Sequence, residues 1–172
     1  TIAALTRTRP ETAEEAIQDL ADLFRASLNH THERMTLAEE LTLARRSLNI
    51  EALRLGDRLQ VEWDMDSVPP DTRVPPLILQ PLLDNAIYHG IEPLPEGGLI
   101  RLTGADGHGM VEITITNPVT GQDGGSHEGN RIAQDHIRQR LGLAFGASAG
   151  LEVVSSADDY RVSIRFPETQ PS

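Results

Sequence analysis

The stretch QPLLDNAIYHG, from Gln80 to Gly90, combines a helical apolar pattern with polar side chains. Asp84, Asn85 and His89 interrupt that pattern. Asp and Asn are poor residues for a helix interior, because their short side chains compete for backbone hydrogen bonds. A buried helix that carries an amide and, one turn later, a histidine therefore needs an explanation beyond packing. The apolar residues recur at helical spacing, which predicts a short helix packed on a core: Leu79, Leu82, Leu83, Ala86 and Ile87.

The composition is that of a folded domain with a strong negative charge. The 172 residues suffice for one domain plus an appendage, and 38% are hydrophobic and 24% charged. With 15 basic and 26 acidic residues the net charge is −11, which argues against direct nucleic acid binding. The absence of cysteine excludes disulfides and thiolate metal sites. No apolar run approaches the roughly 18 residues of a membrane span, so we expect a soluble piece. Because it starts without Met, whether it is the whole protein stays open.

The first third of the chain has the pattern of two amphipathic helices. After TRPE, where Pro10 suits a first helical turn, an apolar stripe extends to Leu28. A second helix starts at TLAEE, where Thr36 and Glu39 have the spacing of a capping box, and Gly56 ends it. Its stripe consists of Leu37, Leu41, Ala44, Leu48, Ala52 and Leu55.

The remaining segments predict strands and two further helices. RLQVEWDM at 58–65 alternates like a strand, and a proline-rich joint at 69–76 leads into the helix quoted above. GGLIRLTG and GMVEITITN predict a hairpin around the turn ADGH at 105–108. A glycine-rich loop precedes a helix from about Ile132 to Phe145, and the strands GLEVVSS and YRVSIRF follow. We therefore expect an α+β fold, with a mixed sheet of about five strands carrying helices on one face, behind an N-terminal helical segment.

The order of these motifs resembles the cytoplasmic part of LytS/AlgZ-type sensor histidine kinases. The series is helix, proline joint, Q-P-L-L-D-N-A-I-x-H-G, hairpin, strand ending in Asn, glycine loop, R-x-R-L and a final hairpin. The resemblance runs from LADLFRASL to the last strand, and PPLILQPLLDNAIYHG is its most specific part. It implies the Bergerat fold of the GHKL group, a two-layer sandwich shared with gyrase and Hsp90, and a site for ATP and Mg²⁺.

In this family the helix asparagine binds magnesium beneath the nucleotide, which assigns the metal to Asn85. Mg²⁺ prefers oxygen ligands, keeps several waters and bridges phosphates, so one amide oxygen is a reasonable protein share. His89, on the same helix face, would donate to phosphate oxygens, and Asp84 would receive a proton or orient water. The alternative is that Asn85 bonds a neighbouring carbonyl and His89 is a satisfied surface histidine. The match of the eleven residues from Gln80 to Gly90 favours the site.

The expected adenine contact is altered in this chain. In the family, a strand ends in D-x-G-x-G, and its Asp accepts a hydrogen bond from the adenine amino group. Here ITITNPVTG puts Asn117 at that position, and only Gly121 remains of the glycines. An Asn carbonyl can still accept from an amino group, although charge-assisted bonds are about twice as strong. The alternative is that Asn117 and Pro118 only form a strand-ending turn.

The expected phosphate loop is altered further. Family members show G-x-G-I-G-L-x-N before the last helix, whereas this chain has GNRIAQDH from Gly129 to His136. Gly129 is kept, but Arg131 and Ala133 replace glycines that would let backbone amides approach phosphate. Either the guanidinium of Arg131 reaches the phosphates instead, or the loop is degenerate. The segment HTHE at 30–33 has metal-ligand composition, but it lies at a helix end without a second ligand group, so we expect a solvated turn.

The resemblance implies phosphoryl transfer rather than hydrolysis. Bergerat ATPases that hydrolyse ATP place a glutamate one turn before the magnesium asparagine, and Pro81 stands there in this chain. Transfer to a histidine needs mainly positioning and charge neutralisation. The family acceptor lies in an H-F-L-F-N-S-L-N helix that this chain lacks, and its six histidines match no acceptor motif. We therefore expect this chain to bind nucleotide without phosphorylating itself.

The chain is expected to have two parts. Residues 1–35 would be a remnant of the dimerisation and phosphoacceptor helices, and residues 36–172 the catalytic ATP-binding domain. The family implies a homodimer, a response regulator with a LytTR DNA-binding domain as partner, and a bacterial inner-membrane anchor, with this part in the cytoplasm. Two alternatives stay open: a nucleotide-binding regulatory module without kinase activity, and a protein-interaction domain that binds no ATP.

Overall fold

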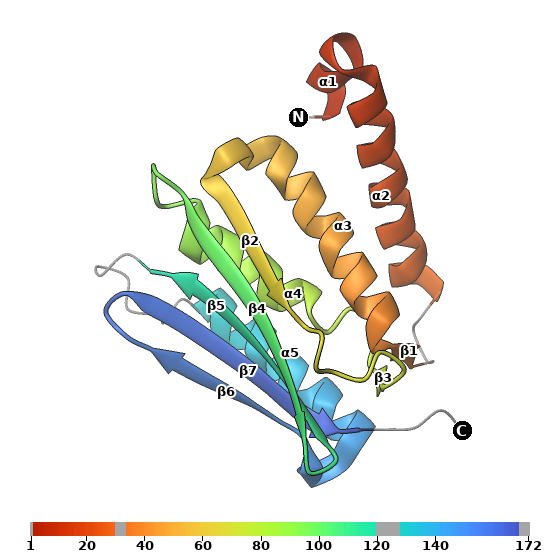
Figure 1. Ribbon diagram of the computed structural model, residues 1–172, viewed down its shortest axis with the longest axis vertical. Coiled ribbons are helices and arrows are strands. Elements are labelled where there is room, and N and C mark those ends of the chain that lie inside the picture. Colours follow the sequence, from red (N-terminus) through yellow and green to blue (C-terminus); the bar gives the residue numbers. More distant parts are fainter. Residues whose placement is uncertain (1, 30–33, 120–127, 169–172) are drawn as a thin grey trace.

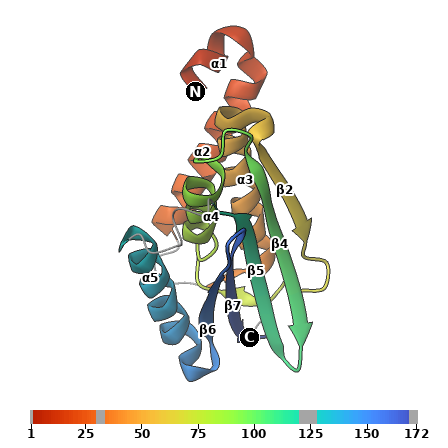
Figure 2. The same ribbon diagram turned by 90° about the vertical axis from the view of Figure 1, so that its left-hand side faces the viewer.

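The computed structural model describes residues 2–29, 34–119 and 128–168. Helices cover one face of a five-stranded sheet, and an N-terminal helical segment lies beyond them (Figures 1 and 2). In chain order the elements are α1 (Ile2–Thr8), α2 (Pro10–Asn29), β1 (Met35–Thr36), α3 (Leu37–Leu55), the 3₁₀ turn η1 (Gly56–Arg58), β2 (Leu59–Asp64), β3 (Arg73–Val74), α4 (Gln80–Ala86), the π-helix η2 (Ile87–Ile91), β4 (Gly98–Gly107), β5 (Met110–Pro118), α5 (Glu128–Phe145), the 3₁₀ turn η3 (Gly146–Ser148), β6 (Gly150–Ser155) and β7 (Asp159–Pro167).

The main sheet is mixed and has the strand order β2-β4-β5-β7-β6. Strand β2 runs parallel to β4, and the other neighbours are antiparallel. A separate antiparallel pair joins β1 to β3, so the start of α3 is tied to the proline-rich joint. The α+β prediction, with five mixed strands and helices on one face, is confirmed.

One face of this sheet supplies the core. Ile113, Ile115 and Asn117 of β5 are buried, and each pairs with a buried residue of β7. Because side chains alternate along a strand, all of them point to the face that α3, α4 and α5 cover (Figure 2). The opposite face is polar: the hydroxyls of Thr114 and Ser163 lie 2.8 Å apart across two strands. The buried end of β5 therefore faces the helices.

Helix α3 begins and ends as its sequence predicts. The Thr36 hydroxyl accepts from the Glu39 amide at 3.2 Å, and the Glu39 carboxylate accepts from the Thr36 amide at 2.8 Å. This reciprocal capping box satisfies two amide groups at the start of the helix. Gly56 follows the last turn with φ of 59°, a value that glycine adopts without steric cost.

Two boundaries differ from the sequence prediction. Strand β4 extends to Gly107, so the hairpin turns at His108 and Gly109 and not over 105–108. Both residues have positive φ, 57° and 72°, as a two-residue hairpin turn with the twist of its strands requires. Helix α5 starts at Glu128, four residues before the expected Ile132, because the last residues of the glycine-rich loop are already helical.

Only part of the apolar stripe of α2 is buried. Ala13 and Ala16 are buried, whereas Ile17, Leu20 and Phe24 are exposed. Figure 1 shows that α3 separates α2 from the sheet, so α2 packs against α3 and, near its start, against α1. Its exposed apolar side chains lie outside the core of the domain.

Candidate functional site

The helix of the opening stretch is not a regular α-helix throughout. The α-helical part ends at Ala86, and Ile87–Ile91 forms a π-helix. At the junction the Ile87 amide approaches the carbonyls of both Leu83 and Asp84, and the Glu92 amide bonds to the Ile87 carbonyl at 2.9 Å. The sequence predicted one continuous helix. Short π segments are rare and occur often at functional sites, and this one contains His89.

Gly90 allows the π-helix to touch the end of strand β5. A Cβ atom at this position would lie 2.2 Å from Nδ2 of Asn117 and 2.9 Å from the carbonyl oxygen of Pro118. No side chain larger than hydrogen fits there without displacing these atoms. The contact brings the helix that carries Asn85 and His89 next to Asn117, the two places where the sequence predicts magnesium and adenine binding.

Asn117 is buried and only partly satisfied. Its Nδ2 donates to the carbonyl oxygen of Pro118 at 2.8 Å. Its Oδ1 is shielded from solvent and has no hydrogen-bond partner in the described part of the chain. A buried acceptor without a partner costs about 1–3 kcal/mol. The side chain thus has its amide nitrogen bonded and its carbonyl oxygen buried without a donor among the described residues.

The polar residues of α4 and η2 have two different environments. Asn85 and His89 are both half-buried, and the His89 ring meets the Tyr88 ring edge-on, with centroids 4.8 Å apart. Asp84 instead accepts from Gln80 at 2.8 Å, and Gln80 also donates to Ser47 of α3 at 2.6 Å. Partial desolvation raises the pKa of the Asp84 carboxyl, opposed by the Gln80 hydrogen bond. Asp84 therefore belongs to the contact with α3.

Arg58 anchors the far end of the π-helix. Its guanidinium donates to the carbonyl oxygens of Glu92 at 3.0 Å and Leu94 at 2.8 Å. A cation at a helix C-terminus satisfies free carbonyls and complements the helix dipole. Nothing in the sequence indicates this role, because Arg58 lies more than thirty residues away, in η1 directly before β2.

Glu40 anchors the near end of the helix. Its carboxylate, 1% exposed, accepts from the amides of Leu77 and Leu79 at 2.7 Å each, directly before α4. Burial raises the pKa of the Glu40 carboxyl to about 7, against the lowering effect of these amides and of the Arg140 charge. The sequence contained one signal for this residue: an acidic side chain three positions after Leu37, on the apolar face of α3.

The proposed phosphate residues are placed only in part. Arg131 is exposed in the first turns of α5, and Gly129 belongs to the same helix. Gly121 lies outside the described residues. Further along α5, Gln134 donates to the hydroxyl of Tyr160, the cross-strand neighbour of Asn117, at 2.6 Å. Helix α5 is thereby linked to the end of β5 through one side-chain bond.

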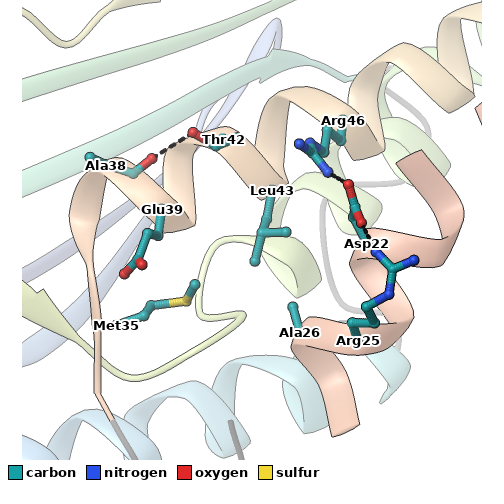
Figure 3. A pocket seen from close by; sticks show the side chains of 9 residues that line it. All are labelled: Asp22, Arg25, Ala26, Met35, Ala38, Glu39, Thr42, Leu43 and Arg46. Atoms are coloured by element: carbon teal, nitrogen blue, oxygen red, sulfur yellow. Dashed lines mark hydrogen bonds and ion pairs between the residues drawn. The ribbon is translucent and has the colours of Figure 1, made fainter. Parts of the chain in front are cut away.

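A cavity of about 400 Å³ lies away from this site, between α2 and α3 (Figure 3). At one end Arg46 of α3 pairs with Asp22 of α2, which also pairs with Arg25. The other walls are mostly apolar. It shares no lining residue with the contact of Gly90 and Asn117. The lining residues are Asp22, Arg25, Ala26, Met35, Ala38, Glu39, Thr42, Leu43 and Arg46.

The expected solvated turn with His30, His32 and Glu33 lies outside the described residues. Among residues 2–29, 34–119 and 128–168, no group of three or more acidic or histidine side chains could hold a metal ion. A metal at Asn85 would therefore need its remaining ligands from water and from a bound molecule, as Mg²⁺ with a triphosphate does.

Comparison with known proteins gives consistent matches. The family model for histidine kinases matches residues 1–59. The sensor histidine kinase YesM of Bacillus subtilis is 32% identical over 88% of this chain and 27% of its own length. BtsS of Escherichia coli K12 is 32% identical over 97% of this chain and 30% of its own, and LytS of Streptococcus agalactiae serotype V is 27% identical over 97% and 31%. The chain thus spans less than a third of each relative.

Solved structures show the same fold. The catalytic domain of the histidine kinase ThkA superposes with a TM-score of 0.58 at 16% identity, over 80% of this chain and 97% of that domain. Full-length ShkA in complex with AMPPNP gives 0.56 at 17% identity, over 91% and 36%. ThkA in complex with the response regulator TrrA gives 0.55 at 16% identity, over 91% and 49%. The expected sandwich is therefore that of histidine kinase catalytic domains.

We expect Gly90→Ala to disturb the site and lower stability by about 2 kcal/mol, since a close-packed position must absorb a methyl group. Gly142→Ala is the matched control, because its Cβ would meet nothing within 4 Å in α5. Alanine there should be neutral or stabilise by up to about 1 kcal/mol. Urea unfolding of both variants measures the difference. Equal stabilities would contradict the tight contact with Asn117.

The Glu40 carboxyl should make stability pH-dependent. Its pKa is about 7 when folded and about 4.5 when unfolded, so the native state binds more protons between these values. Stability therefore falls as pH rises through this window. Relative to Glu40→Gln, which does not titrate, the wild-type free energy of unfolding should fall by about 3 kcal/mol between about pH 4.5 and pH 8. Parallel pH profiles of the two proteins would show that Glu40 does not titrate in this range.

Proposed function

The chain belongs to the family of sensor histidine kinases, and on this basis we propose that it is the ATP-binding catalytic part of such a kinase. The full-length protein would transfer the γ-phosphate of ATP to an upstream histidine and then to a response regulator. The observation that carries this proposal is the contact of Gly90 with Asn117, which joins the two motifs that the ATP site requires.

Asn117 is proposed to bind adenine. Its unpartnered Oδ1 would accept from the exocyclic amino group, while Nδ2 stays bonded to Pro118. This bond satisfies the acceptor that folding leaves without a partner. Because the oxygen is shielded from solvent, binding has to uncover it. The co-structure of ShkA with AMPPNP supports an adenine nucleotide as the ligand of this fold.

Asn85 is proposed to bind Mg²⁺ through its amide oxygen, with the phosphates and water as the other ligands. Its half-buried side chain makes no hydrogen bond to another described residue, which suits a metal ligand. His89 would donate to phosphate oxygens, with Arg131 and the backbone at Gly121 and Gly129 approaching from the loop and α5. Asp84 would act on a proton or a water molecule in a secondary role, since its carboxylate is bonded to Gln80, which contacts α3.

Transfer is favoured over hydrolysis because Pro81 stands where a hydrolytic base would be. It lies in the first turn of α4, where the missing amide of proline costs no hydrogen bond. Phosphoryl transfer to a protein side chain requires that the ions and donors be positioned and that water be excluded. These are tasks that the residues above could perform without a base in this position.

The division of the chain at 35/36 is part of the proposal. Residues 1–35 would belong to the dimerisation and phosphoacceptor helices, and residues 36–172 would form the catalytic domain. Ion pairs of Arg46 with Asp22 and Asp19, next to the cavity of Figure 3, join the two parts. Such a polar, incompletely packed contact is typical of interfaces between domains. The exposed side chains of Ile17, Leu20 and Phe24 would pack in the homodimer.

The proposed partner is a response regulator, as the complex of ThkA with TrrA shows for that kinase. We further propose that this regulator carries a LytTR DNA-binding domain, since LytS is among the relatives. None of the helices in the described ranges is long and apolar enough to cross a membrane. From the family resemblance we propose that the full-length protein has an anchor in the bacterial inner membrane, with this part on the cytoplasmic side.

Nucleotide binding and labelling by γ-phosphate distinguish this function from two alternatives. A regulatory module would bind nucleotide, yet the full-length protein would not be labelled by γ-phosphate. A protein-interaction domain would bind no nucleotide at all. The replacement of two loop glycines by Arg131 and Ala133 is the observation that favours the regulatory module as second candidate.

Asn85→Ala should remove the magnesium contribution to ATP binding. Wild type should bind ATP more tightly with Mg²⁺ than with a chelator, because the ion bridges the amide oxygen and the phosphates. In the variant both conditions should give the same, weaker affinity by calorimetry. Asn49→Ala, on α3, provides a control for the loss of an amide. Magnesium dependence that persists in Asn85→Ala would rule out this residue as the ligand.

Asn117→Ala should weaken ATP binding by about 1–3 kcal/mol, about ten- to hundredfold in affinity. Asn117→Asp should keep the affinity, because it retains an acceptor and adds charge. It cannot donate to the Pro118 carbonyl, so its folding stability should fall, and both quantities have to be measured. Wild type should prefer ATP to GTP, whose ring lacks the donor at this place. Equal affinity for the two nucleotides would exclude the base contact.

A further inference from the structure

The peptide segment before α4 has an unusual conformation. Leu77 has φ of 53°, a left-handed value that is rare for a residue with a branched side chain. Leu79 at the N-cap has no side chain that could accept from the first amides of the helix. Polar groups from outside the segment must therefore hold this conformation and fix where α4 begins.

Helix α3 supplies the acceptor. Both oxygens of the Glu40 carboxylate are used, one for the amide of Leu77 and one for that of Leu79. The two bonds span the left-handed residue and the N-cap. Because the carboxylate is buried, no water competes for these amides, and hydrogen bonds to a charged acceptor are the stronger kind.

Helix α5 supplies the donor. The guanidinium of Arg140 bonds to the carbonyl oxygen of Pro76 and, at 3.3 Å, to that of Leu77. In the described part of the chain Glu40 and Arg140 form no direct ion pair within 4.0 Å. Segment 76–79 lies between the two side chains. Its amides bond to the Glu40 carboxylate and its carbonyl oxygens to the Arg140 guanidinium.

We propose that Glu40 and Arg140 are positioning residues that clamp segment 76–79 from α3 and α5 and thereby set the position of Asn85. The clamp connects three helices: α3 supplies Glu40, α5 supplies Arg140, and α4 begins directly after the clamped segment. Helix α5 also carries Gly129 and Arg131, so the two sides of the proposed phosphate site share this anchor. The inference rests on the proposed ATP-binding function.

The clamp should respond to pH through Glu40. Arg140 is the charged group that acts on this carboxyl from the elements packed against it, and residues 76–79 carry no ionisable side chain. Burial raises the pKa of Glu40 to about 7 and lowers that of Arg140, which stays charged. Ionised Glu40 binds both amides more strongly than the protonated form does. The magnesium-dependent part of ATP binding should therefore grow as pH rises from about 6 to about 8.

The test compares ATP affinity with Mg²⁺ and with a chelator in wild type, Glu40→Gln, Arg140→Gln and Arg140→Lys. Arg138→Gln is the control, since Arg138 is an exposed residue of the same helix that pairs with Asp135. Loss of positioning should lower the magnesium-dependent gain at least about tenfold in the two Gln variants, with chelator affinity unchanged. Arg140→Lys, which keeps the charge, should restore part of the gain. A merely structural role would lower the melting temperature without changing this ratio.

The pH dependence of the magnesium-dependent gain is measured on the same proteins. The triphosphate also titrates near neutral pH, but it does so for both proteins, so only the difference between the wild-type and Glu40→Gln profiles reports Glu40. If Glu40→Gln does not fold, Arg140→Gln decides alone, since Arg140 is only half-buried. Unchanged magnesium gain in the variants would overturn the clamp. Absence of ATP binding in wild type would instead refute the proposed function and, with it, this inference.

Discussion

A buried carboxylate, that of Glu40, accepts the amides of Leu77 and Leu79 where the chain enters α4. The segment cannot hold itself, because it contains a left-handed leucine and a helix start without a side-chain cap. The acid therefore has to be buried together with the amides, and its desolvation costs stability above neutral pH. The helix that presents Asn85 and His89 is placed by this interaction at one end and by Arg58 at the other.

Between these two anchors the helix changes from α to π, and this change determines which residues meet the sheet. The wider turn brings Gly90 against Asn117, where a methyl group would overlap with the amide nitrogen. A glycine at this point is a requirement of the contact between helix and strand. Oδ1 of Asn117 stays buried and without a partner in the described part of the chain, so packing and the proposed adenine recognition depend on the same side chain.

Three charged side chains in this protein hold backbone segments on either side of α4 and η2. Glu40, Arg58 and Arg140 all bond to main-chain groups, and all three act across more than thirty residues of sequence. By contrast, Arg46 pairs with acidic side chains of α2 at one end of the cavity, in a contact that is partly exposed. The backbone contacts of Glu40, Arg58 and Arg140 hold the two ends of the helical stretch α4–η2, whereas the ion pairs of Arg46 join α3 to α2.

The sequence by itself determined the local elements. Period and caps placed α3 from Thr36 to Gly56, alternation placed the five strands, and the eleven residues from Gln80 to Gly90 indicated the family and the residues Asn85 and His89. The sequence did not predict that the hairpin turns at His108 and Gly109, which both have positive φ. It also did not predict the π-helix after Ala86. Only the tertiary structure decided that Gly90 meets Asn117 and that Glu40 and Arg140 bind one segment. Local patterns report the bonds that a segment makes with itself, whereas these contacts join residues from distant parts of the chain, which only the packed core brings together.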